Sequence, residues 1–265
     1  MKYSMKILFA LSAFAIAACS NESFRAVPAP QPAPGPSGQV QILHAASDAP
    51  TVNIVIDGLE TDSDVDYKQS TIEYNLSAGT HTVEVIANLD SGPTSVFGPA
   101  DVTVVADTVT TVAAVGPVAV PLDVAIASKP DVAPAAGMAR VFIVHLAPGP
   151  MDLPVDIYVD AYDEDNPTAI GDSTPIQLAF KGSSDPIELM PGEYQVRVTL
   201  RDSLEAVYDS GPVELSVGDD FTVAAVPNVS GGDAAVTLLA LDPGGSFGAG
   251  ASAELLDINT PTGLR

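Results

Sequence analysis

Two stretches of the chain match each other residue by residue: Val52-Asn53-Ile54-Val55-Ile56-Asp57 and Val155-Asp156-Ile157-Tyr158-Val159-Asp160. In both, a branched apolar residue stands at every second position. Successive side chains of a pleated strand point to opposite faces, so this alternation predicts a strand with one face against a core. Because the stretch occurs twice, it also indicates that the chain is built from two related units.

The repeat extends well beyond these strands. Val65-Asp66-Tyr67-Lys68 matches Leu178-Ala179-Phe180-Lys181, residues 76–85 match 189–198 with the same spacing, and Asp107 is matched to Asp220. The spacing changes only near Met151 and in the loop 161–175. Insertions confined to loops are typical of a duplicated domain, because loops tolerate length changes that a core does not.

The two copies predict an all-β fold. Short apolar segments recur with Gly, Pro, Asn or Asp between them, and no segment after residue 20 has helical periodicity. About seven strands per copy favour two tandem antiparallel β-sandwich domains, immunoglobulin-like or transthyretin-like. The expected division is 1–18 signal peptide, 19–38 lipidated Cys and Pro-rich tether, 39–127 first sandwich, 128–137 linker, 138–242 second sandwich and 243–265 Gly-rich tail.

The N-terminus carries an export signal. Lys2 and Lys6 precede the apolar run 7–18, which is too short to span a bilayer core of ~30 Å and ends at Cys19, the only cysteine. This pattern resembles the lipobox of bacterial lipoproteins. The resemblance implies cleavage before Cys19, a lipid on its sulfur and an acylated N-terminus. The alternative is an ordinary secretory signal with an unpaired cysteine nearby.

The residues after Cys19 suggest where the protein is held. Ser20 rather than Asp follows the cysteine, which favours the outer membrane in a two-membrane bacterium. Prolines at every second position from Pro28 to Pro36 favour an extended polyproline II tether. We therefore expect a protein anchored in the bilayer by acyl chains, with its folded part held away from the surface.

The composition excludes some partners. The chain has 34 acidic against 10 basic residues, a net charge of −24, and removal of Lys2 and Lys6 makes it more negative. Such a surface repels phosphates, so nucleic acid is excluded as a partner. With Cys19 lipidated, no disulfide can form within the chain, and stability must come from burial of its abundant apolar residues.

Residues 40–58, which read Val-Gln-Ile-Leu-His-Ala-Ala-Ser-Asp-Ala-Pro-Thr-Val-Asn-Ile-Val-Ile-Asp-Gly, resemble the opening of the bacterial family known as domain of unknown function (DUF4397). The Ala78-Gly79 and Pro191-Gly192 turns also fit that family. The resemblance covers both copies and is weaker in the second, where the Asp-Ala-Pro turn is lost after His145. It implies exported, often tandem, β-sandwich modules with no agreed activity, and it supplies no catalytic residues.

His44 and His145 occupy equivalent positions and could suggest a metal or catalytic site. However, Val40, Ile42 and His44 share one pleat face, as the matching residues of the second copy do. We therefore interpret both histidines as structural, ending an inward-facing row and bonding turn backbone. His81 matches Tyr194 in the other copy, an exchange that suits packing better than chemistry.

Asp62 and Asp64 are weak candidates for a calcium site. The stretch 62–73 has oxygen-bearing residues at several EF-hand positions, but Tyr67 stands where the loop needs Gly, and no helices flank it. The motif around Tyr67 is also expected to be extended strand. Residues 163–165 form a comparable acidic cluster, and solvated loops are the default interpretation of both. The sequence predicts no cofactor.

Two function classes fit the sequence. The first is a non-catalytic lipoprotein that presents tandem sandwiches for binding or adhesion to an envelope or extracellular protein or glycan. The second is an enzyme or enzyme-accessory module acting on cell-envelope or extracellular polysaccharide through paired carboxylates, whose separation nothing in the sequence fixes. A repeat of core residues with divergent loops favours the first class, and we expect no enzymatic activity.

Overall fold

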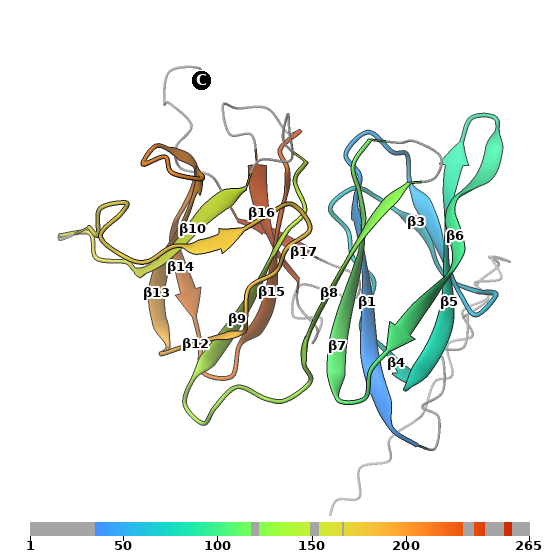
Figure 1. Cartoon of the computed structure of the whole chain (residues 1–265), viewed down its shortest axis with the longest axis horizontal. Helices are drawn as coiled ribbons and strands as arrows, with labels where there is room; N and C mark the ends of the chain where they lie inside the picture. The colour runs from blue at the N-terminus through green and yellow to red at the C-terminus, as the bar shows by residue number, and fades with distance from the viewer. Residues whose placement is uncertain are drawn as a thin grey trace, which may run out of the picture.

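A computed structural model describes residues 35–117, 122–148, 154–165, 167–229, 236–241 and 252–255. Its regular elements in these ranges are all strands (Figure 1). The first copy contains β1 (Ser37–Ala45), β2 (Val52–Ile56), β3 (Leu59–Val65), β4 (Tyr74–Ser77), β5 (Gly79–Leu89), β6 (Gly92–Val104), β7 (Thr108–Val115) and β8 (Asp123–Pro130). The second contains β9 (Ala139–His145), β10 (Val155–Ala161), β11 (Ile176–Leu178), β12 (Ile187–Leu189), β13 (Gly192–Leu200), β14 (Ala206–Leu215), β15 (Asp220–Pro227), β16 (Val236–Leu241) and β17 (Ser252–Leu255).

The strand order repeats between the copies. The first has sheets β4-β1-β7-β8 and β3-β2-β5-β6; the second has β12-β9-β15-β16-β17 and β11-β10-β13-β14. Each of the first eight strands thus has a counterpart in the second copy. The expected all-β fold with two tandem β-sandwiches is confirmed. Most pairings are antiparallel, and the structure adds one parallel pair per copy, β1 with β7 and β9 with β15, which the sequence did not indicate.

The parallel pairs also correct one detail of the repeat. Val40 pairs with Thr110 in β7, whereas the equivalent Val141 pairs with Phe221 in β15. Asp220 therefore has its counterpart at Val109, and the expected match of Asp107 with Asp220 is wrong by two residues. The difference arises inside β6, at the register shift of its pairing with β5, because Val104 to Val109 and Leu215 to Asp220 are equally long.

Alternation explains the core of each sandwich. Val52, Ile54 and Ile56 of β2 are buried, with half-buried residues between them. Together with the inward residues of β1, β5 and β7 they fill the space between the two sheets of the first copy. Val155, Ile157 and their neighbours do the same in the second copy. Burial of these branched side chains stabilises each sandwich by about 1.5–3 kcal/mol per residue.

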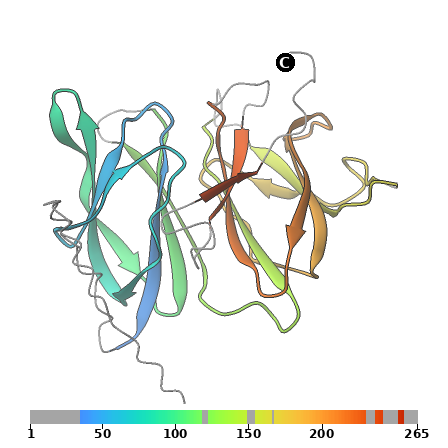
Figure 2. The same cartoon turned by 180° about the vertical axis from the view of Figure 1, so that it is seen from behind.

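The two sandwiches pack on each other through a third core. The inner sheets, β4-β1-β7-β8 and β12-β9-β15-β16-β17, lie face to face in the middle of the molecule, and the views in Figures 1 and 2 agree on this arrangement. We call the buried residues between them the interface core: Leu43, Ala45, Ala113, Val115, Ala125, Ala127, Phe142, Val144, Leu146, Ala224, Val226, Leu239 and Leu241. The molecule is therefore a stack of four sheets.

The ends of the strands show where the chain passes from one sandwich to the other. β8 runs to Pro130 and β9 begins at Ala139, so the chain crosses between sandwiches in residues 131–138. Within the expected Gly-rich tail, Ser252–Leu255 forms β17, which pairs antiparallel with β16 and extends the inner sheet of the second copy. The sequence did not predict this strand, because four residues carry too little alternation to be recognised.

Candidate functional site

The predicted lipidation residue Cys19 lies outside the described residues, as do the signal peptide 1–18 and most of the tether. Lipidation and outer-membrane location therefore stay predictions. Among the described residues, no helix is long and apolar enough to cross a membrane.

His44 lies buried at the end of β1, with 1% of its surface exposed. Its Nε2 is 3.0 Å from the carbonyl oxygen of Pro50, and its ring stands edge-on to Tyr67 at a centroid distance of 6.2 Å. Burial lowers the pKa of His44, although the Pro50 carbonyl and nearby Asp66 act in the opposite direction. The ring therefore links the turn at Pro50 to the loop that carries Tyr67.

His145 lies at the equivalent place, at the end of β9, and is 2% exposed. Its ring stands edge-on to Phe180 at 6.3 Å, as His44 does to Tyr67. The backbone N–H of Lys68 donates to the His44 carbonyl at 2.9 Å, and that of Lys181 donates to the His145 carbonyl at 2.8 Å. Both histidines thus have the expected buried positions, and their structural role remains our interpretation.

The Tyr67 and Phe180 motifs, the strongest repeat signal beside the strands, turn out to lie at the contact between copies. Both aromatic rings pack against the interface core. The Tyr67 hydroxyl donates to the Pro227 carbonyl across the contact. Lys68 reaches Glu254 of the second copy at 2.6 Å, and Lys181 reaches Asp123 of the first. The motif therefore recurs because each copy uses it to hold the other.

These motifs are turns, so the expectation that they are extended strand is wrong. β3 ends at Val65, and both Lys68 and Lys181 have left-handed backbones, with φ of 70° and 65°. The turn brings the lysine back over its own aromatic ring, with Nζ 5.7 Å and 5.5 Å from the two ring centroids. The alternation of apolar residues could not reveal this turn. The motif has only two or three apolar residues, and the same short pattern is found at the end of a strand and in a turn that follows it.

A buried charge cluster closes one end of the interface. Lys129 of β8, in the first copy, lies 2.7 Å from Asp220 of the second, and Arg140 of β9 reaches the same carboxylate at 2.5 Å. Burial alone would raise the pKa of Asp220, but hydrogen bonds from Arg140 and Lys129 outweigh it and lower that pKa. The Asp220 hydrogen bond in turn raises the pKa of Arg140. The Asp220 carboxylate thus forms ion pairs with two buried cations, one from each copy.

Asp62 and Asp64, the calcium candidates, take part in separate hydrogen bonds. Asp62 accepts from the Tyr74 hydroxyl at 2.6 Å, and Asp64 accepts from the side chain of Asn88 at 3.1 Å. Asp64 has a left-handed φ of 55°. In the described ranges, no three His, Cys, Asp or Glu side chains lie close enough together to hold a metal ion. The cluster 163–165 is exposed, and Asp163 accepts from the N–H of Asp165 at 3.0 Å in a local turn.

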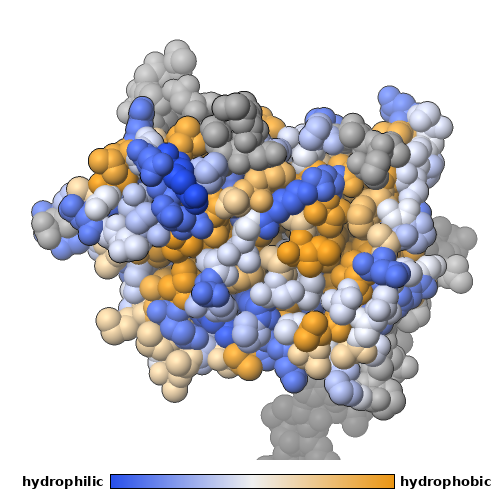
Figure 3. Space-filling view, in the orientation of Figure 1, coloured by the Kyte–Doolittle hydropathy of each residue, from blue (hydrophilic) through white to orange (hydrophobic). Residues whose placement is uncertain are grey.

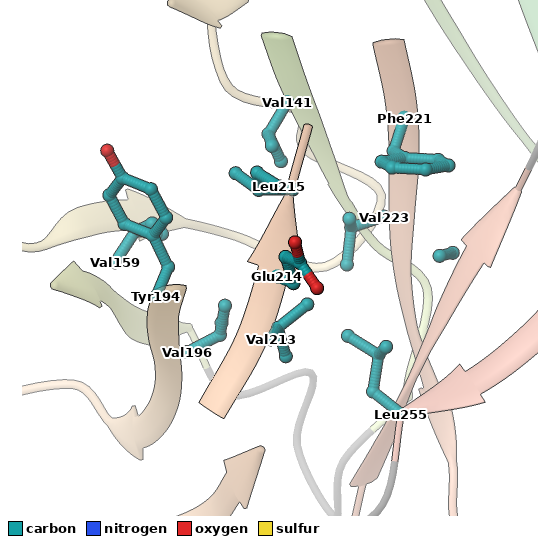
Figure 4. A pocket seen from close by; sticks show the side chains of 11 residues that line it. Val141, Val159, Tyr194, Val196, Val213, Glu214, Leu215, Phe221, Val223 and Leu255 are labelled. Carbon is teal, nitrogen blue, oxygen red and sulfur yellow. The ribbon is translucent and has the colours of Figure 1, made fainter. Parts of the chain in front are cut away.

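A cavity of about 120 Å³ opens between the two sheets of the second sandwich. Val213 and Leu215 line it from β14, Phe221 and Val223 from β15, and Leu255 from β17 (Figure 4). The rest of the lining consists of Val141, Val159, Tyr194, Val196, Glu214 and Ala240. Its walls are almost wholly apolar, and its volume is similar to that of an apolar cavity that holds benzene.

The lining of this cavity includes the edge strands of both sheets. β14 is the last strand of its sheet and β17 the last of the other, and the Tyr208 hydroxyl of β14 donates to the Leu255 carbonyl of β17 at 2.9 Å. Glu214 on β14 is the charged residue of the lining. Its partner across the strand pair is Glu193, and both are exposed. The sequence does not indicate this site, since only the register of β13 and β14 brings the two glutamates together.

One face of the molecule is mixed in hydropathy. Figure 3 shows hydrophobic residues gathered in several separate patches over both sandwiches, between hydrophilic ones. The large apolar surface that the inner sheets share is enclosed in the interface core. The cavity at the β14 and β17 edges is therefore the candidate binding site that the described residues support best.

Comparison with known proteins gives a family model and a few distant structures. The model for a domain of unknown function (DUF4397) matches residues 38–153, which span the first sandwich, the connection and β9. This is one copy, so assignment of the second sandwich to that family stays a prediction. No protein with a curated description matches the chain.

The solved structures are similar only at a low level. A leucine-rich repeat protein from Bacteroides thetaiotaomicron shares 12% identity at a TM-score of 0.20, covering 71% of this chain and 25% of its own. A candidate cell adhesion protein from Bacteroides fragilis shares 9% identity at 0.20, covering 77% and 96%. A candidate adhesin from Bacteroides ovatus shares 10% identity at 0.21, covering 78% and 93%. TM-scores this low do not indicate a function for the chain.

Proposed function

We propose that this chain is an exported lipoprotein, anchored through Cys19, that binds an envelope or extracellular partner without catalysing a reaction. A DUF4397 domain model matches its first sandwich, and the family resemblance implies an exported module. The proline-rich tether and the lipobox-like motif around Cys19 support anchoring at the outer membrane. Acyl chains would supply the attachment, at about 0.8 kcal/mol per buried CH₂.

The observation that carries the binding role is the interface core. It joins the two sandwiches into one four-layer block, so that loops and edges of both copies keep a fixed geometry. Preorganised surfaces bind with a smaller entropy cost than surfaces on independently moving domains. A rigid block at the end of an extended tether suits presentation of a binding surface.

The charged groups favour binding over polysaccharide hydrolysis. A general acid in a glycoside hydrolase is a carboxyl group whose pKa is raised. Among the described residues, the carboxyl groups with a clearly altered pKa have it lowered. The Lys181 side chain lowers the pKa of Asp123, and the bonds from Arg140 and Lys129 lower that of Asp220 despite its burial. Asp57 follows the same pattern beside His81. These carboxylates serve as ion-pair partners.

A cell experiment tests the proposal. Cells that express the wild type or Cys19→Ser are labelled with a fatty-acid analogue and fractionated. Label in the wild type alone, at the outer membrane, supports the anchor, and equal labelling of both refutes it. The unlipidated Cys19→Ser chain is then incubated with envelope fractions and glycans. Retention without release of shortened polymer supports binding, whereas steady turnover of a polysaccharide would show an enzyme.

A further inference from the structure

We propose that the cavity of the second sandwich is a binding site for a small uncharged aromatic molecule, about the size of benzene. This inference goes beyond the proposed function, and neither depends on the other. It rests on the walls of the cavity, on its volume and on the way its lining differs from the equivalent positions of the first sandwich.

Both sheets of the second sandwich contribute to the walls of the cavity. Strands β10, β13 and β14 line it from one sheet, and β9, β15, β16 and β17 line it from the other. The buried Tyr208 hydroxyl donates to the Leu255 carbonyl at 2.9 Å and so ties β14 to β17. The two sides of the cavity are therefore held together by the protein itself, and a site that is formed before its ligand arrives binds at a smaller entropy cost.

A small side chain beside an added strand leaves the space. Val223 pairs with Ala240 in the second sandwich, and the equivalent Val112 pairs with Ile126 in the first. Alanine therefore stands where the first copy has isoleucine. Ala240 is 6% exposed and Ile126 is 53% exposed, because β17 lies next to β16, whereas β8 is the last strand of its sheet. The second sandwich thus has an additional wall with a small residue next to it.

Two polar residues of the first sandwich are replaced by aromatic ones in this lining. Tyr194 stands where the first copy has His81, and Phe221 stands where it has Thr110. Figure 4 shows the two rings on different sides of the lining, with valine and leucine side chains between them. Aromatic rings attract another ring, edge-on or offset, more strongly than the burial of area alone accounts for. The lining therefore favours a ligand that is itself an aromatic ring.

Charge and size narrow the class of ligand further. Glu214 is the charged residue of the lining, so an anionic ligand is repelled, and a cationic one would lose its hydration among apolar walls. The volume of about 120 Å³ is somewhat smaller than that of an engineered apolar cavity of about 150 Å³ that holds benzene. The site therefore has room for one uncharged ring of about six carbon atoms and little more.

The probes are benzene, cyclohexane and benzoate, added in sealed cells to the mature Cys19→Ser chain. Binding is followed by thermal unfolding and by nuclear magnetic resonance of the methyl groups. Benzene at a free concentration about tenfold above its dissociation constant should raise the melting temperature by about 3–6 °C. Cyclohexane should bind about fivefold more weakly, because it lacks the interaction between aromatic rings. Benzoate carries a negative charge and should not change the melting temperature.

Variants locate the site. Ala240→Ile introduces the side chain of the first sandwich and fills the cavity, so it should weaken benzene binding by about tenfold or more while the free protein melts no lower than the wild type. Ala240→Val fills less of the space and should give an intermediate loss. Ala161→Ile adds the same atoms at the exposed end of β10, outside the lining, and is the matched control that should bind as the wild type does.

In the wild type, benzene should shift the methyl signals of Val196, Leu215 and Leu255 and leave those of the first sandwich unchanged. Equal shifts in both sandwiches, equal binding by Ala240→Ile and the wild type, or no rise in melting temperature up to the solubility limit of benzene would overturn the site. Benzoate that binds as tightly as benzene would overturn the class of ligand. If Ala240→Ile melts lower than the wild type, the methyl shifts of the wild type and the affinity of Ala240→Val decide.

Discussion

The charge cluster at the interface offers the sharpest test of the four-layer arrangement. Replacing Asp220 by Asn keeps the size of the side chain and removes the charge that Lys129 and Arg140 share. Their side chains are only 2% and 3% exposed, so neither cation can turn easily to solvent. We expect Asp220→Asn to destabilise the whole block.

The magnitude follows from the burial of these groups. Removing one partner of a buried ion pair costs about 3–5 kcal/mol, because an uncompensated charge is left behind. Asp220 is 21% exposed, and Arg140 keeps its bond to the carbonyl of Val132, so the cost should lie near the lower value, about 3 kcal/mol. At a slope of about 2–3 kcal/mol per molar urea, the unfolding midpoint falls by about 1 M.

Urea unfolding of the mature Cys19→Ser chain, followed by far-UV circular dichroism and tyrosine fluorescence, measures this change. Asp123→Asn is the matched control, because it removes another carboxylate that crosses the same contact, to Lys181. Those two side chains are 59% and 31% exposed, so the loss should stay below about 1 kcal/mol. A midpoint for Asp220→Asn no lower than that of Asp123→Asn would refute the buried cluster.

The same cluster predicts a pH dependence. A carboxyl group whose pKa is lowered on folding stabilises the protein above its unfolded pKa, and that contribution is lost as pH falls through the folded pKa. The pKa of Asp220 is lowered by Arg140 and Lys129 against the effect of burial. The difference in stability between wild type and Asp220→Asn should therefore be full at neutral pH and shrink in acid, below the ordinary aspartate range. A difference that is constant down to strongly acidic pH would contradict this assignment.

Three further outcomes can be measured by thermal or chemical unfolding. His44→Ala should destabilise the protein by about 1–3 kcal/mol, through the lost Pro50 bond and a small cavity, and the equivalent change in the second sandwich should do the same; no effect in either would contradict a structural role. Burial acts to lower the pKa of His81, but its bond to Asp57 raises it overall, so this pair stabilises at low pH and the contribution is lost as pH rises through the folded value; His81→Tyr, which copies the second sandwich, should remove that dependence. Calcium and magnesium should stabilise almost equally and only at millimolar concentration, about 1.4 kcal/mol at tenfold excess over the dissociation constant; a micromolar, calcium-selective shift lost in Asp62→Ala or Asp64→Ala would show a specific site.

Much of the fold could be predicted because local patterns carry it. The period of two in 52–56 and 155–159 gave the strands, and the repeat gave two sandwiches with matching strand order. The buried positions of His44 and His145 followed from their parity with Val40 and Val141. Site prediction was weaker, since Glu193 and Glu214 are far apart in sequence and meet only through the register of β13 and β14.

Three strands carry a sequence signal for the contact between the copies. Strands β7, β9 and β16 are apolar on both faces, and nearly every residue in them is buried. A strand with a second apolar face must be covered on both sides, as strands in the middle of layered proteins are. This pattern predicts that something packs on the inner sheets, although it does not say what.

The sequence by itself determined the strands, their inward faces and the duplication, because each depends on side chains only a few residues apart. Only the tertiary structure decided that the copies pack back to back, that the Tyr67 and Phe180 turns hold this contact, and that β17 extends one sheet. These features depend on which apolar faces and edges find each other across the whole chain. Burial is non-directional, so the apolar composition requires only that the second faces of the inner sheets be covered. Which surface covers them is decided by shape and by the placement of Lys129, Arg140 and Asp220 at the contact.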